Sequence, residues 1–449
     1  LFRSRDELQA LGHSFQTQGD TEVVLTAFLE WKTDCFTKFN GMWALAILDL
    51  EQQQLILSRD RFGEKPLYYY WDSENFIFGS EIKSLLAHPV IKPRPNLERI
   101  YRYLATNYRY GDIYPDSFFE GIFQVPSGSY LRFQPGQSPE VRNYWKLSTF
   151  QVDKDPQILT QQFLELFTDS VRLRLRSDVP VASLLSGGMD STSVTAVARS
   201  LLGIPIRSFS GIMEETPGAF NESKFIESVS RFTSTPTSYV FPNPQDLNQT
   251  VEEMIYYFDE PVCTVTWYAA FLLSKSIAGQ SVPVLLNGHA GDELLGGYWD
   301  HYHYHFWDLS ESRQNALRSH EIRCWKQNHQ RDPSEIQRHQ SYWTALLKKE
   351  ITEVERFPDY SFLFKENPPP SSWTPPAFKT CFQDSLSQRL FQELFYETTP
   401  AILKTEDRCT MAHSLESRTP FLDYRLVEFC FSLPSEVKIR DGYGKWILR

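Results

Sequence analysis

Apolar positions in the second half of the chain form helix-length repeats that alternate with strand-length runs. Residues 158–178 show helical spacing with an arginine-rich polar side, which predicts an amphipathic helix with that side exposed. Strand-length apolar runs begin after Pro180 and return at 206–212, 239–241 and 282–287, with helical stretches between them. Strands that alternate with helices predict a parallel sheet with helices on both faces and ligands at the carboxyl ends of the strands.

In the first half the apolar stretches are shorter, and polar turn residues separate them as in β-hairpins. This pattern predicts a layered antiparallel domain. Helical spacing at 21–31 follows Gly19 and Asp20, which are suited to cap a helix. The apolar run at 41–49 predicts a strand buried on both faces, and 55–59 predicts its hairpin partner. Taken residue by residue, this half shows no catalytic constellation.

Length predicts at least two domains. The 449 residues exceed one ordinary core, and we place the boundary near residue 150, which gives domains at 1–150 and 151–449. The stretch from about 301–372 is rich in His, Tyr, Trp and Gln and predicts a variable helical insert. We interpret its alternating histidines as surface or packing residues rather than metal ligands: His301, His303 and His305.

Charge, hydropathy and cysteine usage exclude several classes of protein. The net charge of −11 argues against a nucleic-acid partner, and no apolar run reaches the length of a membrane span. Six scattered cysteines without a CxxC pair indicate neither a zinc site nor a disulfide framework, so we expect a cytoplasmic protein. The sequence starts at Leu1 and stops at Arg449 in mid-pattern, and we expect that both ends are cut.

A strand-length apolar run leads into the sequence Ser-Gly-Gly-Met-Asp-Ser. Strand, glycine turn and helix leave free backbone N–H groups around an anion, and Gly187 and Gly188 allow its close approach. Ser186 and Ser191 add hydroxyl donors, and Asp190 can hold a cation. An ordinary tight turn is the alternative, but the full run resembles the pyrophosphate loop SGGxDS of ATP pyrophosphatases.

A second strand-to-glycine turn, from Asn287 to Tyr298, carries Asp292. Asp190 and Asp292 can share one divalent cation, because carboxylate oxygens beside phosphates suit Mg²⁺. Asn287 and Gly288 would then face the same nucleotide. The alternative for Asp292 is ordinary acidic charge at a helix N-terminus.

Four runs of the first half resemble the glutaminase domain of class II glutamine amidotransferases: GDTEV, FNGMWALAILD, RDRFGEKPLYY and SEIKSLL. The resemblance implies an incomplete N-terminal-nucleophile αββα sandwich, in which Asp20 contacts the α-amino group of glutamine. The family's N-terminal cysteine nucleophile and the segments that follow it would precede Leu1. We expect that they are missing from this sequence, and the alternative is a protein that uses free ammonia.

The second half resembles glutamine-hydrolysing asparagine synthetases at 404–423 and 437–449, and the likeness extends from Gly19 to Arg449. It implies a parallel-sheet ATP-pyrophosphatase domain, of the adenine nucleotide α-hydrolase-like kind. In that domain Lys445 would stabilise charge in the transition state of adenylation.

The resemblance also implies substrates and a reaction. ATP would place its phosphates on the first glycine loop and its adenine near Leu184 and Gly211, with Mg²⁺ beside it. The side-chain carboxylate of aspartate would attack the α-phosphorus, and ammonia released from glutamine would attack the resulting acyl-adenylate. The sequence does not determine the oligomeric state, and a homodimer is one alternative.

Two departures from the family pattern leave alternatives. His289 stands where one common version of the second loop, SGEGSDE, has a candidate general base, and an imidazole can take a proton near neutral pH. Trp267 and Tyr268 stand where the family often has small residues, so we expect a reshaped acceptor pocket. The rivals are an enzyme that adenylates another carboxylate, from a secondary metabolite or sugar acid, and a catalytically silent scaffold.

Overall fold

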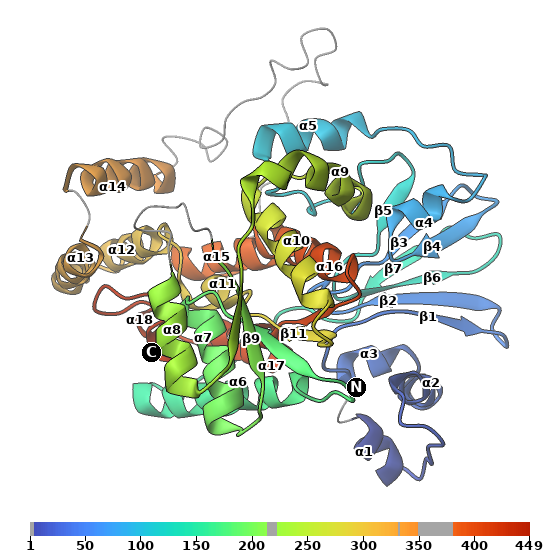
Figure 1. Ribbon diagram of the computed structural model, residues 1–449, viewed down its shortest axis with the longest axis horizontal. Coiled ribbons are helices and arrows are strands. Elements are labelled where there is room, and N and C mark those ends of the chain that lie inside the picture. The colour runs from blue at the N-terminus through green and yellow to red at the C-terminus, as the bar shows by residue number, and fades with distance from the viewer. Residues whose placement is uncertain (1–3, 213–221, 331–332, 349–379) are drawn as a thin grey trace, which may run out of the picture.

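The computed structural model describes residues 4–212, 222–330, 333–348 and 380–449, which form two layered units (Figure 1). The first unit contains two antiparallel sheets, and the second is built on one parallel sheet. The end of the predicted insert, at 349–372, lies outside the described residues. Among the described helices, none combines the length and apolar character that a membrane crossing requires.

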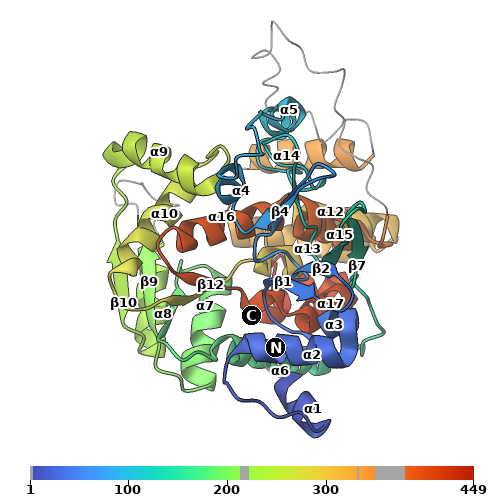
Figure 2. The same cartoon turned by 90° about the vertical axis from the view of Figure 1, so that its right-hand side faces the viewer.

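The sheets of the first unit pack face to face, with helices on their outer sides (Figure 2). One has the order β1-β2-β6-β7, with strands Ala44–Asp49, Gln54–Arg59, Ser129–Phe133 and Glu140–Asn143. The other has the order β4-β3-β5, with strands Phe76–Gly79, Tyr68–Trp71 and Ile122–Gln124. The flanking helices are α1 Ser4–Ala10, α2 Asp20–Trp31, α3 Cys35–Lys38, α4 Ile82–Leu86 and α5 Leu97–Thr106.

Alternating side chains of β2 explain these layers. Ile56 packs among residues of α1, α2 and α3, whereas its neighbour Leu57 packs toward the second sheet. β2 is therefore buried on both faces, and so is its neighbour β6, whose Tyr130 and Leu131 pack on opposite sides. The prediction of two buried faces for 41–49 is wrong, because β1 is an edge strand whose Leu48 is 65% exposed. The αββα layering itself is confirmed.

All neighbouring strands of the second unit are parallel, in the order β10-β9-β8-β11-β12. Their bounds are β8 Val181–Leu184, β9 Arg207–Gly211, β10 Thr237–Val240, β11 Val284–Leu286 and β12 Glu416–Arg418. Sequence patterns predicted the first four of these strands. They missed β12, since its three residues include no apolar side chain.

Helices cover both faces of this sheet, as predicted. On β11, Leu285 packs with Ile277 of helix α10, whereas Leu286 packs with side chains of α6 and α7 on the other face. The helices of the second unit are α6 Pro156–Arg174, α7 Met189–Ala196, α8 Ser223–Thr233, α9 Leu247–Phe258, α10 Val265–Ala278, α11 Gly291–Leu295, α12 His301–Glu311, α13 Asn315–His329, α14 Pro333–Leu347, α15 Ser385–Gln392, α16 Thr399–Met411, α17 Tyr424–Ser432 and α18 Ser435–Lys438.

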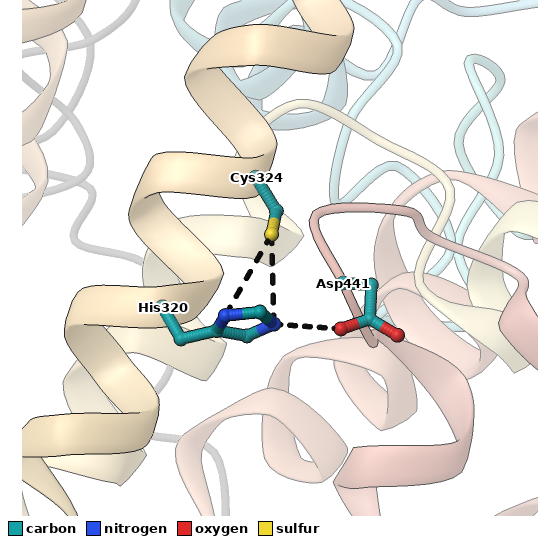
Figure 3. A group of neighbouring side chains, drawn as sticks. All are labelled: His320, Cys324 and Asp441. Carbon is teal, nitrogen blue, oxygen red and sulfur yellow. Dashed lines mark hydrogen bonds and ion pairs between the residues drawn. The ribbon is translucent and has the colours of Figure 1, made fainter.

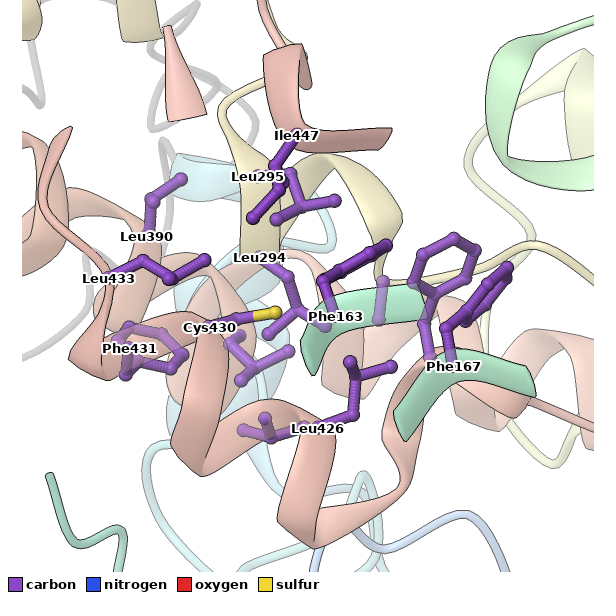
Figure 4. Close-up of a cluster of buried hydrophobic side chains, with 14 of the residues drawn as sticks. Phe163, Phe167, Leu294, Leu295, Leu390, Leu426, Cys430, Phe431, Leu433 and Ile447 are labelled. Atoms are coloured by element: carbon purple, nitrogen blue, oxygen red, sulfur yellow. The ribbon is translucent and has the colours of Figure 1, made fainter. Parts of the chain in front are cut away.

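The largest hydrophobic core joins segments that are far apart in the chain (Figure 4). Phe163 and Phe167 of α6 contribute to it, with Leu294 of the short helix α11. Leu426 of α17 and Ile447 near the C-terminal end belong to the same core. A five-residue helix such as α11 has little stability of its own, so this packing fixes its position.

Helix α12, at the start of the predicted insert, is part of the core. His301, His303 and His305 are all buried. Of the two roles expected for them, a position on the surface is wrong and packing in the core is confirmed. Tyr302, Tyr304 and Phe306, each of which follows one of these histidines, also belong to the main core. A helix that is buried around most of its circumference has no polar face for solvent, which explains its unusual composition.

Buried polar contacts connect the two units. Lys65 Nζ lies 3.1 Å from Asp407 Oδ1, and Lys404 Nζ lies 3.3 Å from Asp112 Oδ1. Asn40 donates a hydrogen bond of 2.9 Å to Asp423.

Replacing Asp423 by asparagine is expected to lower the thermal unfolding midpoint at pH 7, and less so as the pH falls. Burial opposes ionisation, but Arg425 and Arg174 hold the pKa of Asp423 at about 2, below its ordinary 3.8. The carboxylate therefore stabilises the fold above pH 4, by about 2 kcal/mol, and this contribution is lost as the pH falls toward 2. Thermal unfolding of both proteins at pH 7 and pH 3 checks this. An equal midpoint difference at both pH values would contradict it.

Candidate nucleotide site

The candidate site lies where the strand order of the parallel sheet reverses. From β8 the chain continues to β9 on one side, while β11 lies on the other side of β8. At such a switch point the loops that follow the two neighbouring strands diverge and leave a crevice at their carboxyl ends. The two glycine loops predicted from the sequence follow β8 and β11, so they meet at this crevice.

Glycines allow the two loops to touch. A Cβ atom on Gly288 would lie 2.5 Å from the backbone nitrogen of Ser191. A Cβ on Gly291 would lie 2.4 Å from Asp190 Cγ. Real Cβ atoms do not come this close to other atoms, so larger residues at 288 and 291 would force the loops apart.

The first loop is held by its own serines. The Ser191 hydroxyl accepts a hydrogen bond of 3.1 Å from the Ser186 nitrogen and lies 2.9 Å from the Ser186 hydroxyl. Gly187 adopts φ 84°, a left-handed conformation that favours glycine, and Gly188 is the N-cap of α7. The loop therefore has the strand, turn and helix geometry expected of an anion-binding site.

Leu184 and Gly211 lie beside this loop. They end the adjacent strands β8 and β9, and the nitrogen of Leu185 donates a hydrogen bond of 2.9 Å to the Phe209 carbonyl. The two positions expected near adenine therefore share the carboxyl edge of the sheet with Ser186.

Lys445 joins the two loops. Its ammonium lies 2.6 Å from Asp190 Oδ2 and 2.8 Å from Asp292 Oδ1. Its backbone nitrogen donates to the carbonyl of Leu295, which attaches the C-terminal segment to α11. Gly297 makes room for this arrangement, since a Cβ there would lie 2.2 Å from Lys445 Cε.

The local charge favours a cation. Burial, and then the neighbouring Asp292, raise the pKa of Asp190 to about 7, although Lys445 acts in the opposite direction. Burial, Asp292 and Glu393 raise the pKa of Glu293 to about 8. Burial disfavours the charged form of Lys445, but Asp292 and Asp190 outweigh it and raise its pKa. The site therefore carries more potential negative charge than Lys445 alone neutralises.

Asp190 and Asp292 fit a magnesium ion. Both offer carboxylate oxygens at one point, where the Lys445 ammonium now supplies the positive charge. Asp190 Oδ1 is buried and has no hydrogen-bond partner among the described residues. Hard oxygen donors of this kind are the ligands that Mg²⁺ prefers.

His289 belongs to a separate hydrogen-bonded chain next to these carboxylates. Its Nε2 lies 3.4 Å from Glu406 Oε2, and Glu406 Oε1 accepts a hydrogen bond of 2.9 Å from Ser417. Asn287 Nδ2 donates to the Ser417 hydroxyl at 2.7 Å, and Asn287 Oδ1 accepts from the His289 nitrogen at 3.0 Å. Burial lowers the pKa of His289, but Glu406 outweighs burial and the net shift is upward.

Sequence reasoning did not single out Glu406 and Ser417. Glu406 lies on α16 and Ser417 on β12, and both belong to the 404–423 run that resembles asparagine synthetases. That run was the available signal. The β11–β12 ladder, which the sequence did not predict, brings Ser417 to the second loop, and Ser417 in turn bonds to Glu406.

Other predicted residues lie away from this crevice. Asp20 is exposed at the first position of α2 in the first unit, and Gly19 is the N-cap. Trp267 and Tyr268 are buried, where they pack with Met254 and Phe258 of α9. Both rings fill space between helices, and the expectation that they reshape an acceptor pocket stays a prediction.

Comparison with known proteins agrees with the two units. The family described as "Asparagine synthase" matches residues 162–449, and "Glutamine amidotransferase domain" matches residues 3–145. The chain is 31% identical to glutamine-hydrolyzing asparagine synthetase 3 of Bacillus subtilis (strain 168), over 99% of this chain and 70% of that protein. It is 33% identical to a putative glutamine-hydrolyzing asparagine synthetase 2 of Methanocaldococcus jannaschii, over 64% of this chain and 55% of that protein.

A fungal relative has a different name. Amidase chry2 of Gibberella zeae is 26% identical, over 97% of this chain and 68% of that protein. The family matches and the two-unit fold together lead to one conclusion: the chain belongs to the asparagine synthetase family and carries a glutamine amidotransferase domain.

Proposed function

We propose that this protein uses ATP to adenylate the side-chain carboxylate of aspartate and then forms the amide with ammonia from glutamine. The observation that carries the proposal is the position of Lys445 between Asp190 and Asp292 at the switch point of the sheet. A lysine held beside two potential metal ligands and a glycine-lined anion loop suits a reaction that transfers a nucleotidyl group and releases pyrophosphate.

The chain's residues divide into binding groups under this proposal. The phosphates lie on the loop formed by Ser186, Gly187, Gly188 and Ser191, and the adenine lies near Leu184 and Gly211. Asn287 and Gly288 form the opposite wall of the crevice. Asp190 and Asp292 would hold Mg²⁺, which when bound supplies charge neutralisation for the leaving pyrophosphate.

Lys445 and His289 have different roles. Lys445 stabilises negative charge on the phosphates, and its raised pKa keeps it an ammonium at neutral pH. His289 takes a proton from the attacking ammonia at Nδ1, because Nε2 faces Glu406. This step requires the neutral ring, and the raised pKa of His289 shifts that form to higher pH. The imidazole of His289 thus takes the place of the glutamate base that the family pattern SGEGSDE has at the same position of the second loop.

The amidotransferase unit supplies the ammonia. We place Asp20 at the α-amino group of the glutamine. The route to the sheet crosses the contact between the units, where a cavity of about 610 Å³ lies between Phe62 and Trp145 of the first unit and Phe391 and Phe395 of the second.

A second candidate is the same chemistry on a different carboxylate. The relative named as an amidase supports this second candidate, because it matches almost the whole chain.

Pyrophosphate release in the presence of ATP, Mg²⁺ and ammonium salt tests the acceptor. We expect release with aspartate, and much slower release with glutamate or with sugar acids. Ammonium is supplied so that the result does not depend on the amidotransferase unit. Release with another acid alone would transfer the assignment to the second candidate, and release with none of the acids would refute adenylation.

Replacing Lys445 by methionine is expected to slow pyrophosphate release by about 10²- to 10³-fold, because it removes a positive charge aimed at the phosphates. Lys275→Met is a suitable control, since Lys275 is half-exposed and pairs with Glu253 on the surface. If both variants retained full rates, Lys445 would have no catalytic role.

Replacing Gly291 by alanine is expected to reduce pyrophosphate release at least about tenfold, because the new methyl group displaces Asp190. Gly279→Ala is the matched control, since a Cβ there meets no atom within 4 Å. The same assay compares the two variants. Equal activity in both would show that the spacing between the loops does not limit the reaction.

A further inference from the structure

Helix α13 holds the turn that precedes Lys445. The Glu321 carboxylate accepts hydrogen bonds from the nitrogens of Asp441 and Gly442, at 3.0 Å and 2.9 Å. The Asn328 side chain donates to the Asp441 carbonyl at 2.9 Å. Contact is so close that a Cβ on Gly442 would lie 2.2 Å from the Trp325 nitrogen. The helix therefore determines where this turn lies.

A histidine, a cysteine and an aspartate converge at this contact (Figure 3). His320 and Cys324 are four residues apart on α13, so their side chains project from one face. His320 Nε2 lies 2.7 Å from Asp441 Oδ1 and 3.5 Å from Cys324 Sγ. One potential ligand atom from each of the three residues lies within 4.8 Å of the other two.

We propose that His320, Cys324 and Asp441 form a zinc site that ties α13 to the turn before Lys445. Thiolate, imidazole and carboxylate are together a donor set for Zn²⁺, whereas Mg²⁺ and Ca²⁺ prefer oxygen ligands alone. Three protein ligands leave a fourth tetrahedral position, and His320 and Asp441 are about half exposed, so water can fill it. The cysteine spacing pattern did not predict this site, because its ligands come from two separate segments.

Zinc binding requires the side chains to adjust. Cys324 Sγ lies 4.0 Å from His320 Nδ1 as well as close to Nε2, so the imidazole must turn its Nε2 lone pair toward the sulfur (Figure 3). Zinc bonds of about 2.0 Å to nitrogen and about 2.3 Å to sulfur give a tetrahedral N···S separation near the present 3.5 Å. The present Nε2···Oδ1 distance of 2.7 Å is a hydrogen bond, and it must open to roughly 3.3 Å. On binding, the Cys324 thiol loses its proton to solvent and its sulfur donates an electron pair to Zn²⁺.

A second cluster is less suited to a metal. Asp300, His301 and Glu393 also lie close together, and all three are buried. The Arg389 guanidinium already lies 2.7 Å from Glu393 and occupies the position of a counter-ion. At the α13 cluster, the Arg440 guanidinium lies farther away, with its Nε 3.7 Å from the other oxygen of Asp441.

Zinc at this site would fix the turn that carries Lys445. Any consequence for adenylation rests on the proposed function, but metal binding itself does not. The test therefore measures metal without nucleotide, and it can succeed or fail whatever the enzyme's substrate.

Titration of the full chain with Co²⁺, a spectroscopic substitute for Zn²⁺, tests the proposal directly. We expect one cobalt ion per chain with a thiolate-to-metal charge-transfer band, and Zn²⁺ should displace it. Cys324→Ser should abolish the band, and His320→Gln should weaken binding at least about tenfold. Cys381→Ser, at an exposed cysteine in another segment, should leave both unchanged.

Hydrogen exchange gives a second readout. Zn²⁺ should slow amide exchange of residues 440–445 in the wild-type chain and in Cys381→Ser, but not in Cys324→Ser or Asp441→Asn. The proposal is overturned if the cobalt band is missing in the wild-type chain. It is also overturned if the band survives Cys324→Ser, or if exchange at 440–445 is unaffected by Zn²⁺.

Discussion

The pairing of one ammonium with two carboxylates organises the second half of this protein. Lys445 lies between Asp190 and Asp292, and two of the three side chains are only 11% exposed. Charges with so little access to water need close partners, because desolvation costs several kcal/mol per unpaired ion. Three segments from distant parts of the sequence must therefore meet at one point. Glycines at 288, 291 and 297 allow that meeting, since a Cβ at each would overlap an atom of the other segments.

The sheet topology brings these segments together. β8 and β11 are neighbours in space although about a hundred residues separate them in sequence, and each ends in a glycine loop at the same edge. Hydrophobic packing then fixes the third segment: Ile447 lies in the core with Leu294 and Leu295 of α11. The apolar residues of α11 and of the C-terminal segment thus position Asp292 and Lys445, which belong to the same two segments. Packing of the core and geometry of the site are therefore coupled.

Local signals in the sequence were enough for much of this arrangement. Strand-length runs before the two loops predicted four parallel strands, and the family resemblance indicated Asp190, Asp292 and Lys445 as one site. Features that depend on tertiary context were not predictable in the same way. β12 has no apolar pattern, yet its pairing with β11 places Ser417 between Asn287 and Glu406 of α16, the residue that contacts His289. The burial of His301 likewise depends on its contact of 2.6 Å with Glu393, which lies 92 residues away.

The turn before Lys445 shows why the helical stretch after residue 301 matters to the site. Asp441, Gly442 and Lys445 all have positive φ, at 51°, 72° and 53°. Left-handed conformations cost about 1 kcal/mol or more at residues other than glycine, so the turn needs support from outside itself. Glu321 of α13 supplies it at the nitrogens of 441 and 442, and the Tyr302 hydroxyl of α12 accepts from the Gly444 nitrogen at 2.7 Å. Helices α12 and α13 are therefore structural supports for the lysine, and a change in their packing must move its ammonium relative to Asp190 and Asp292.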